Sequence, residues 1–441
     1  MLRRGALTVF VLVVSVSPAD AHQPSAPSAD DFPATVATTW FEFLYDVVKA
    51  EKTPPPQASR IYGITAVALY EAIAGGTLEH RSLAGQLNGL TSVPAADKEK
   101  TYHWPTVATV VLANTIRSLY HVSAPNMLGR INTLDRKFAS EYQARVKAED
   151  YERSVAHGRA VTGAILMWAA TDGLSVHHDC PHASLATAGA WRPTPPQFDA
   201  RPLQPCWGQL RPMVLTSTDV CGAPGPLQFS DNTTSRFHAA AVEVYKVGVG
   251  LSEEQKTIAR YWADNPGETG TPAGHWIDIV SQIARKDRLS LAKAAEAYAR
   301  VGIAVHDAFI GCWKTKYVYN LRRPVTYIND NFHGRWRSYV ATPNFPSYPS
   351  GHSVQSGAVA RVLTDMFGTR SFRDTTHVDH GLVPFLAPRA FRSFEDAAAE
   401  AAVSRLYGGI HYVFDNDHGL TSGKCIGEAI LGRVKFRFGH P

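Results

Sequence analysis

The sequence predicts an all-α fold of two packed helical units. Apolar residues recur at helical spacing through most of the 441-residue chain, and no convincing run shows the alternation of a half-buried strand. This length exceeds what one ordinary hydrophobic core supports. Two units therefore suit the chain better than one.

The N-terminal residues 1–21 have the pattern of a signal peptide. Two arginines near the start precede an apolar run over residues 6–16, and Ala19-Asp20-Ala21 supplies a small-residue cleavage site. The run is shorter than the ~18 apolar residues of a membrane span, and no run of that length follows. We expect cleavage after Ala21 and a periplasmic or secreted protein without an integral membrane segment. A retained N-terminal anchor is the alternative.

The N-terminal helical unit is expected over residues 34–232, after a disordered lead-in at residues 22–33 that is rich in Ser, Pro, Ala and Asp. Helical spacing predicts helices near residues 35–50, 57–74, 102–119, 126–147 and 149–171. Residues 173–232 hold many Pro, Gly and Thr with little periodicity. We call this segment the excursion, and expect an irregular loop of the kind that often forms a lid or a bridge.

The C-terminal helical unit is expected over residues 233–441. Ser252-Glu-Glu-Gln255 has the residues of a capping box and opens a helix that runs to about Asp264. Further helices are predicted near residues 233–247, 274–286, 290–317, 352–367, 389–407 and 418–433. A faint internal repeat supports the two units, because residues 62–75 align with residues 298–311. Chance similarity of helix composition is the alternative.

The charge of the chain narrows the classes of possible partners. The net charge is +5, and the basic residues are scattered without long runs or a recognised nucleic-acid motif, which argues against a nucleic-acid partner. A mildly basic surface suits small anionic substrates.

One disulfide is expected among Cys180, Cys206 and Cys221, with the pairing left open. Cys312, on an apolar helix, is expected to be a buried thiol.

Lys316 and Arg323 form the first of three motifs in the C-terminal unit. On a continuous helix their spacing places both side chains on nearly one face, about 10 Å apart along the axis. Pro324 marks where this helix should stop or kink. Two cations placed in this way predict a site for one anion, because Lys supplies a point charge and Arg a planar fork that matches two oxygens.

Ser350, Gly351 and His352 form the second motif. Pro346 and Pro349 keep the preceding residues extended or turned, and helical spacing begins at His352. Ser350 and Gly351 are therefore expected at a helix N-terminus, where free N–H groups and the helix dipole favour an anion. His352 lies in the first turn and is the candidate general acid–base.

Arg405, His411 and Asp415 form the third motif. On one straight helix Arg405 and His411 would lie roughly 120° apart, but Gly408 and Gly409 interrupt the helix and let both side chains turn toward one point. Asp415 follows His411 by one helical turn, where its carboxylate can hold one ring nitrogen protonated and make the other more basic. His411 is therefore the candidate nucleophile or metal ligand.

Each motif alone has an ordinary structural explanation. A Lys/Arg pair is usually a solvated helix face, Ser-Gly at a helix start is usually a cap, and a His followed by Asp is usually a surface pair. The three motifs together, in this order, favour a pocket for a tetrahedral oxyanion. The molecule bound in this pocket would be phosphate or a phosphate analogue.

The combination Lys-x6-Arg-Pro, Pro-Ser-Gly-His and Ser-Arg-x5-His-x3-Asp resembles the shared signature of the vanadium haloperoxidases, the type 2 phosphatidic acid phosphatases and the bacterial acid phosphatases. All three motifs match without substitution, within residues 313–415. Trp313 and Phe345 are similar to aromatic residues of the haloperoxidase branch, with core packing as the alternative. The resemblance implies two packed four-helix-bundle-like units, as in the vanadium chloroperoxidases.

The resemblance also implies a vanadate cofactor with His411 as the vanadium ligand. The vanadate- or phosphate-binding residues would be Lys316, Arg323, Ser350, Gly351, His352 and Arg405. His352 would serve as the acid–base group, Lys316 would polarise bound peroxide, and Asp415 would orient His411. Trp313 and Phe345 would form a possible halide site. The enzyme would then oxidise halide with hydrogen peroxide.

Two other functions stay open from the residues. The chain could be a periplasmic acid phosphatase that needs no vanadate, in which His411 attacks the phosphorus of a phosphate ester to form a phosphohistidine and His352 protonates the leaving oxygen. It could also be a non-catalytic oxyanion-binding protein. The sequence leaves the halide, the organic acceptor and the oligomeric state open.

Overall fold

The computed structural model describes residues 26–120, 125–178, 180–181 and 187–439, and its helices confirm the predicted all-α class. The α-helices, in chain order, are α1 Thr35–Ala50, α2 Pro55–Ala74, α3 Trp104–Tyr120, α4 Pro125–Gln143, α5 Ala148–Ala169, α6 Leu174–His177, α7 Arg236–Val249, α8 Glu253–Tyr261, α9 Thr271–Lys286, α10 Leu291–Tyr319, α11 Pro324–Asn331, α12 Gly351–Phe367, α13 Thr376–Asp379, α14 Phe394–Tyr407 and α15 Val413–Arg433. The 3-10 helices are η1 Ala29–Asp31 and η2 Trp207–Gln209. Within the described ranges the one sheet is an antiparallel pair, β1 Phe372–Asp374 with β2 Arg389–Phe391.

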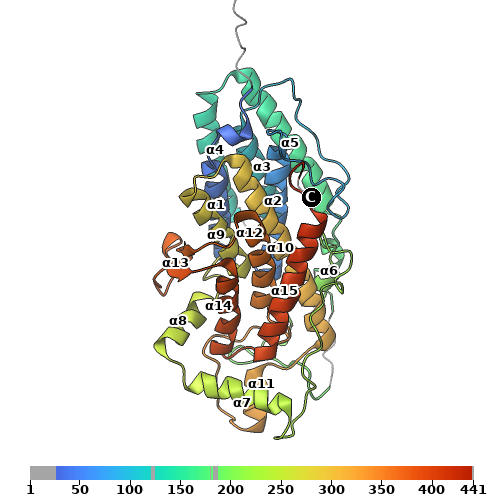
Figure 1. The fold of residues 1–441 in the computed structure, drawn as a ribbon, viewed down its shortest axis with the longest axis vertical. Coiled ribbons are helices and arrows are strands. Elements are labelled where there is room, and N and C mark those ends of the chain that lie inside the picture. Colours follow the sequence, from blue (N-terminus) through green and yellow to red (C-terminus); the bar gives the residue numbers. More distant parts are fainter. Residues whose placement is uncertain (1–25, 121–124, 179, 182–186, 440–441) are drawn as a thin grey trace, which may run out of the picture.

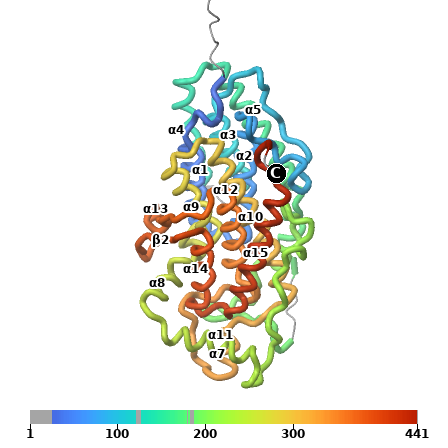
Figure 2. The backbone as a smooth tube through the Cα atoms, viewed as in Figure 1, coloured from blue at the N-terminus to red at the C-terminus, as the bar shows by residue number. Residues whose placement is uncertain are grey.

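Helices α10 and α12 run through the middle of the molecule, with α14 and α15 beside them (Figure 1). Helix α10 packs against α2, and α12 packs against α10, α14 and α15. Helices α1 to α5 gather at one end, and α7 and α11 lie at the opposite end. The C-terminal stretch returns to the N-terminal helices (Figure 2), where the Arg81 N–H donates to the Phe436 carbonyl at 2.9 Å.

Helices α2 and α10 cross at small residues. A Cβ on Gly302 would lie 2.7 Å from the Cβ of Ala66, and one on Gly63 would lie 2.9 Å from the carbonyl oxygen of Gly302. Such distances are shorter than close packing permits, so the approach of the two helices depends on glycine. All three residues fall in the two segments of the predicted repeat, and these segments therefore pack on each other.

Most predicted helices agree with the observed ones within a few residues, and the capping box of Ser252 is confirmed. Residues 389–391, predicted as the start of a helix, instead pair with β1 as strand β2. Helix α11 was not predicted, because Pro324 was expected to stop a helix. Pro324 is instead the first residue of α11, where its missing N–H costs no helical hydrogen bond.

The prediction of a disordered lead-in at residues 22–33 is wrong for the described residues 26–33. Ser28 caps η1 through a capping box with Asp31. The Ser28 hydroxyl and the Ala29 N–H both donate to the carbonyl of Gly76, at 3.0 and 2.9 Å. Ala29 is fully buried. Capping and tertiary contacts therefore order a segment whose polar composition alone suggests disorder.

Two disulfides fasten the excursion, whose described residues are largely irregular. Cys180 pairs with Cys206 inside it, and this is the expected bridge among the three cysteines. Cys221 pairs with Cys425 of α15, a partner that the sequence did not suggest. Cys312 is a buried free thiol, as expected.

The predictions about export and about the boundary between the two helical units stay untested. Residues 1–21 and the cleavage site after Ala21 lie outside the described residues, so export stays a prediction. Among the helices of the described ranges, none has both the length and the apolar character needed to cross a bilayer. The boundary at residue 232 also stays a prediction, and one hydrophobic cluster contains residues from both sides of it, such as Trp40 and Val359.

Substituting Gly302 by Ala should destabilise the protein, because the added methyl group would push α2 and α10 apart. Overpacking of this kind costs about 1–3 kcal/mol, which urea unfolding followed by circular dichroism can measure. Gly311→Ala, in the same helix, is the matched control, since its Cβ would meet only Ile426 at an ordinary 3.7 Å. An equal loss of stability in both variants would contradict the importance of the crossing.

Candidate active site

A cavity of about 430 Å³ opens where the three sequence motifs meet. Six of the predicted site residues line it: Trp313, Phe345, Gly351, His352, Arg405 and His411. The remaining predicted oxyanion-binding residues are fully buried: Lys316, Arg323 and Ser350. Although these residues come from four separate stretches of the chain, they lie along or directly behind the lining of one cavity.

His411 lies in the turn between α14 and α15. Gly408 and Gly409 interrupt the helix as predicted, with Gly409 at a φ of +75°. The His411 Nδ1–H donates to Asp415 Oδ2 at 2.8 Å, which leaves the lone pair on Nε2. Arg323 Nη1 donates to that nitrogen at 3.1 Å. Burial and the surrounding cations hold the pKa of His411 well below its ordinary value, so a neutral, oriented imidazole can act as ligand or nucleophile.

Asp415 joins several parts of the site. Besides the bond from His411, its Oδ2 accepts the Ser347 hydroxyl at 2.5 Å, and its backbone carbonyl accepts the Ser350 N–H at 3.0 Å. Burial raises the pKa of the Asp415 carboxyl, while the Ser347 hydroxyl and the nearby cations oppose this rise. One residue thus ties the N-terminus of α15 to that of α12 and orients the candidate ligand.

The prediction that Lys316 and Arg323 share one helical face is wrong. Helix α10 ends before Arg323 because Asn320 takes a left-handed conformation, with φ 45°. Arg323 is extended, as a residue before proline prefers. Its side chain still turns inward, where Nε donates to the Phe345 carbonyl at 2.8 Å and Nη1 to the Ile410 carbonyl at 2.9 Å. Loop conformation, rather than helical spacing, brings the two cations together.

Lys316 is buried against the loop that leads into α12. Its Nζ donates to the backbone carbonyls of Pro346, Ser347 and Pro349 at 3.0, 2.9 and 2.6 Å. Burial lowers the pKa of Lys316. These three bonds use all the ammonium protons. Lys316 therefore positions the loop in front of Ser350, and it adds positive charge to the site from behind the cavity lining.

Ser350, Gly351 and His352 occupy the N-terminus of α12, as predicted. Ser350 is the N-cap, and its hydroxyl oxygen accepts the Ser353 N–H at 3.4 Å. The first N–H groups of a helix have no acceptor within that helix. The Gly351 end of α12 therefore presents backbone donors and the positive end of the helix dipole to the cavity.

His352 faces a carboxylate that the sequence motifs did not reveal. Its Nε2 lies 3.7 Å from Asp264 Oδ2, too far for a hydrogen bond, so Asp264 acts on it electrostatically. Burial and the charge of Arg405 lower the pKa of His352 to about 4. His352 is therefore neutral near pH 7, with Nε2 directed toward the Asp264 carboxylate.

Asp264 is held by a buried ionic array. His275 Nδ1 lies 3.0 Å from Asp264 Oδ1, and its Nε2 lies 2.7 Å from Asp374 Oδ2. Burial opposes protonation of His275, but the two carboxylates hold its pKa well above the ordinary value. Asp374 is distant in the sequence from the other two, and none of the three belongs to a motif, so only the predicted helix end near Asp264 hinted at any of them.

Three buried cations give the site an excess of positive charge. Burial lowers the pKa of Arg323 to about 9 and that of Arg405 to about 10, so both stay protonated at neutral pH beside Lys316. Arg323 Nη2 and Arg405 Nε are buried donors without an acceptor among the described residues. Buried charge and unmet donors are both unfavourable. A tetrahedral oxyanion would relieve both, so the residues present fit vanadate or phosphate.

Comparisons with known proteins agree with this chemistry. The family model of the VCPO second helical-bundle domain matches residues 296–439. The chain is 24% identical over 277 residues to the vanadium chloroperoxidase of Curvularia inaequalis, a match that covers 48% of this chain and 46% of that protein. The chain thus spans less than half the length of this curated relative.

Two solved structures extend the comparison to the whole fold. This chain is 34% identical to the chain in the crystal structure of the first bacterial vanadium-dependent iodoperoxidase, with a TM-score of 0.85. The match covers 92% of this chain and 97% of that one. The holo-type bacterial vanadium-dependent chloroperoxidase is 15% identical with a TM-score of 0.66, over 88% and 96% of the two chains, and shows likeness of fold alone. The chain belongs to the vanadium-dependent haloperoxidase family. The resemblance seen in the motifs is thereby confirmed, whereas the roles of individual residues stay predictions.

Replacing Asp415 by Asn should weaken vanadate binding about 10- to 100-fold, because the carboxylate that orients His411 and keeps its Nδ1 protonated would be lost. Isothermal titration of the purified protein with vanadate measures this change. Asp417→Asn, an exposed position in the same helix, is the matched control and should bind as the parent does. Unchanged affinity in the Asp415 variant would contradict its orienting role.

His352 should contribute to the free energy of unfolding a part that is lost as the pH drops from about 6.5 to 5. Folded His352, with a pKa of about 4, stays neutral in this range, while the unfolded chain takes up a proton near pH ~6.5. The unfolded state then binds more protons, so stability is lost toward acid. Since its side chain is 13% exposed, we expect a contribution of about 1–2 kcal/mol from His352.

Urea unfolding at the two pH values measures this slope. His352→Gln should remove the His352 contribution from the slope, and comparison with the parent separates His352 from other titrating groups such as Asp415. His333→Gln, at an exposed position, should keep the slope of the parent protein. The idea fails if the two variants have the same slope.

Proposed function

We propose that the chain is a vanadate-dependent haloperoxidase that oxidises halide with hydrogen peroxide, and that iodide is one of its halides. The observation that carries the proposal is the buried, positively charged oxyanion site beside the aromatic pair Trp313 and Phe345. The bacterial iodoperoxidase, 34% identical over nearly its whole length, supports the choice of halide.

The residues of the site have complementary parts in this proposal. His411 Nε2 would bind vanadium, with the Nδ1 proton held by Asp415. Arg323, Arg405 and the N-terminus of α12 would balance the charge of the vanadate oxygens. Vanadate, when bound, supplies a Lewis acid that activates hydrogen peroxide. Neutral His352 would accept the proton released by peroxide, and the Asp264 carboxylate would stabilise the resulting imidazolium.

The aromatic pair forms an apolar surface next to the cations. The ring centres of Trp313 and Phe345 lie 5.0 Å apart, and Lys316 Nζ lies 5.8 and 5.1 Å from them. The ammonium lies over both rings in cation–π contacts, and an apolar surface beside buried cations favours a large, weakly hydrated anion. This arrangement suits iodide.

A periplasmic phosphatase is the second candidate, because the same oriented His411 and the same cations could form a phosphohistidine. In that reaction the His411 Nε2–phosphorus bond would form, the ester oxygen would leave, and His352 would give that oxygen a proton. The low pKa of His352 disfavours the acid role at neutral pH.

A vanadate titration of the purified protein separates the candidates. Added vanadate should activate the oxidation of iodide by hydrogen peroxide in a saturable way, and His411→Ala should abolish it. A phosphatase would instead hydrolyse a phosphate monoester and be inhibited by vanadate, which mimics its transition state. Hydrolysis without halide oxidation would overturn the proposal. Saturable vanadate binding with neither activity would indicate a non-catalytic oxyanion-binding protein.

A further inference from the structure

We propose that residues 187–206, fastened at one end by the Cys180–Cys206 disulfide, form a specificity-determining wall of the active-site cavity. We call this segment the wall. This inference rests on the proposed haloperoxidase function and concerns the access and placement of halide. The excursion contributes four residues to the cavity lining, and all four belong to the wall: Thr194, Gln197, Asp199 and Leu203.

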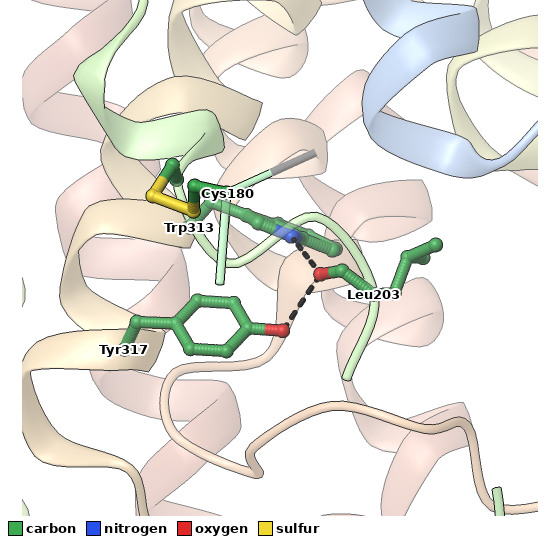
Figure 3. The surroundings of a disulfide bond; sticks show 5 residues. Cys180, Leu203, Trp313 and Tyr317 are labelled. Atoms are coloured by element: carbon green, nitrogen blue, oxygen red, sulfur yellow. Dashed lines mark hydrogen bonds between the residues drawn. A yellow bond between two sulfur atoms is a disulfide. The ribbon is translucent and has the colours of Figure 1, made fainter. Parts of the chain in front are cut away.

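Leu203 is the positioning residue of the wall. Its carbonyl oxygen accepts two hydrogen bonds from α10, one from Trp313 Nε1 at 3.2 Å and one from the Tyr317 hydroxyl at 2.6 Å. Figure 3 shows both side chains directed at this one oxygen, with the disulfide close by. Because the indole N–H is used in this bond, it is not free to bind halide. The wall thereby fixes which part of Trp313 faces the cavity.

The wall is also bonded to the segment that carries Phe345. The Leu203 N–H donates to the Asn344 carbonyl at 3.0 Å. The Asn344 amide in turn donates to Asp199 Oδ2 at 3.1 Å and to the Arg201 carbonyl at 3.0 Å. Asn344 directly precedes Phe345, so one short stretch of the wall holds both aromatic residues of the possible halide site.

Among the residues that the structure describes, the oxyanion site touches the wall only near its N-terminal end, where the Trp191 N–H donates to the Asn320 carbonyl at 2.7 Å and the Arg322 N–H donates to the Gly189 carbonyl at 2.9 Å. Its bonds run through Asp415, His411, Arg323 and the loop at residues 346–349, as described above. A change confined to the end of the wall that carries Leu203 and Cys206 should therefore alter halide binding and leave vanadate binding nearly intact. This separation distinguishes a specificity role from general loss of structure.

The disulfide matters because regular secondary structure does not fix the wall. At its C-terminal end Cys206 leads into η2, which is seated directly on α10, since a Cβ on Gly208 would lie 2.4 Å from Lys314 Cα. Cys180 ties the chain before the wall to this seated end. Without the bridge, Leu203 would rely on its few hydrogen bonds, and segments with few fixed contacts open most easily.

The test compares two pairs of cysteine substitutions in the full-length protein loaded with vanadate. Cys180→Ser/Cys206→Ser should raise the KM for iodide roughly 3- to 10-fold, the effect of losing about one hydrogen bond, while vanadate affinity changes less than about twofold. Cys221→Ser/Cys425→Ser breaks the bridge to α15 and is the matched control, which should keep the KM of the parent. If the first pair does not fold, Tyr317→Phe removes one bond to Leu203 and should raise the KM in the same direction.

A second readout does not depend on turnover. Iodide quenching of Trp313 fluorescence is obtained as the difference between each protein and the same protein carrying Trp313→Phe. Trp313 is 1% exposed, so quenching should be weak in the parent and stronger in Cys180→Ser/Cys206→Ser. If no variant oxidises iodide, the proposed function fails and the quenching alone decides the role of the wall.

Two outcomes would overturn the inference. In an active protein, an unchanged KM for iodide in Cys180→Ser/Cys206→Ser, or an equal change in the control pair, would show that the wall does not govern halide. In an inactive protein, unchanged quenching would show the same.

Discussion

Buried positive charge around His411 is the constraint to which the rest of the site is fitted. The chain places Lys316, Arg323 and Arg405 in its interior, where burial works against ionised groups. Backbone carbonyls offset part of this cost, as the 2.6 Å bond from Arg405 Nη1 to the Trp262 carbonyl illustrates. Carbonyl dipoles stabilise a cation without neutralising it, so the net charge is kept for an anion. A carboxylate paired with each cation would have stabilised the protein without a ligand, but it would also have cancelled the positive charge that attracts an oxyanion.

The helical scaffold meets this constraint by using helix ends more than helix faces. The start of α12 and the break between α14 and α15 meet at the cavity, against the face of α10 that carries Phe309 and Trp313. Helix ends leave backbone groups unpaired, and here those groups bond the site side chains or face the cavity. The central position of α10 and α12 (Figure 1) holds these ends at fixed distances. Rigid packing in the middle thus supports an irregular polar region at the active site.

The sequence predicted what local spacing controls and missed what tertiary contacts decide. Helical periodicity placed most helices, and the three motifs found His352, His411 and their cationic neighbours. The prediction that Lys316 and Arg323 share one helical face was wrong, because Asn320, in a left-handed conformation, ends the helix between them. The array of Asp264, His275 and Asp374 has no spacing signal, since its members come from different elements. The order of residues 26–33 likewise depends on Gly76, a distant residue that composition cannot reveal.

The bridge from Cys221 to Cys425 has a topological consequence. It closes the chain between those residues into a covalent ring, and every residue of the three motifs lies inside this ring. A single peptide-bond cleavage anywhere within the ring opens it but separates nothing, because the two new ends stay linked through sulfur. A molecule nicked once on a surface loop would therefore remain one covalent body around an intact pocket.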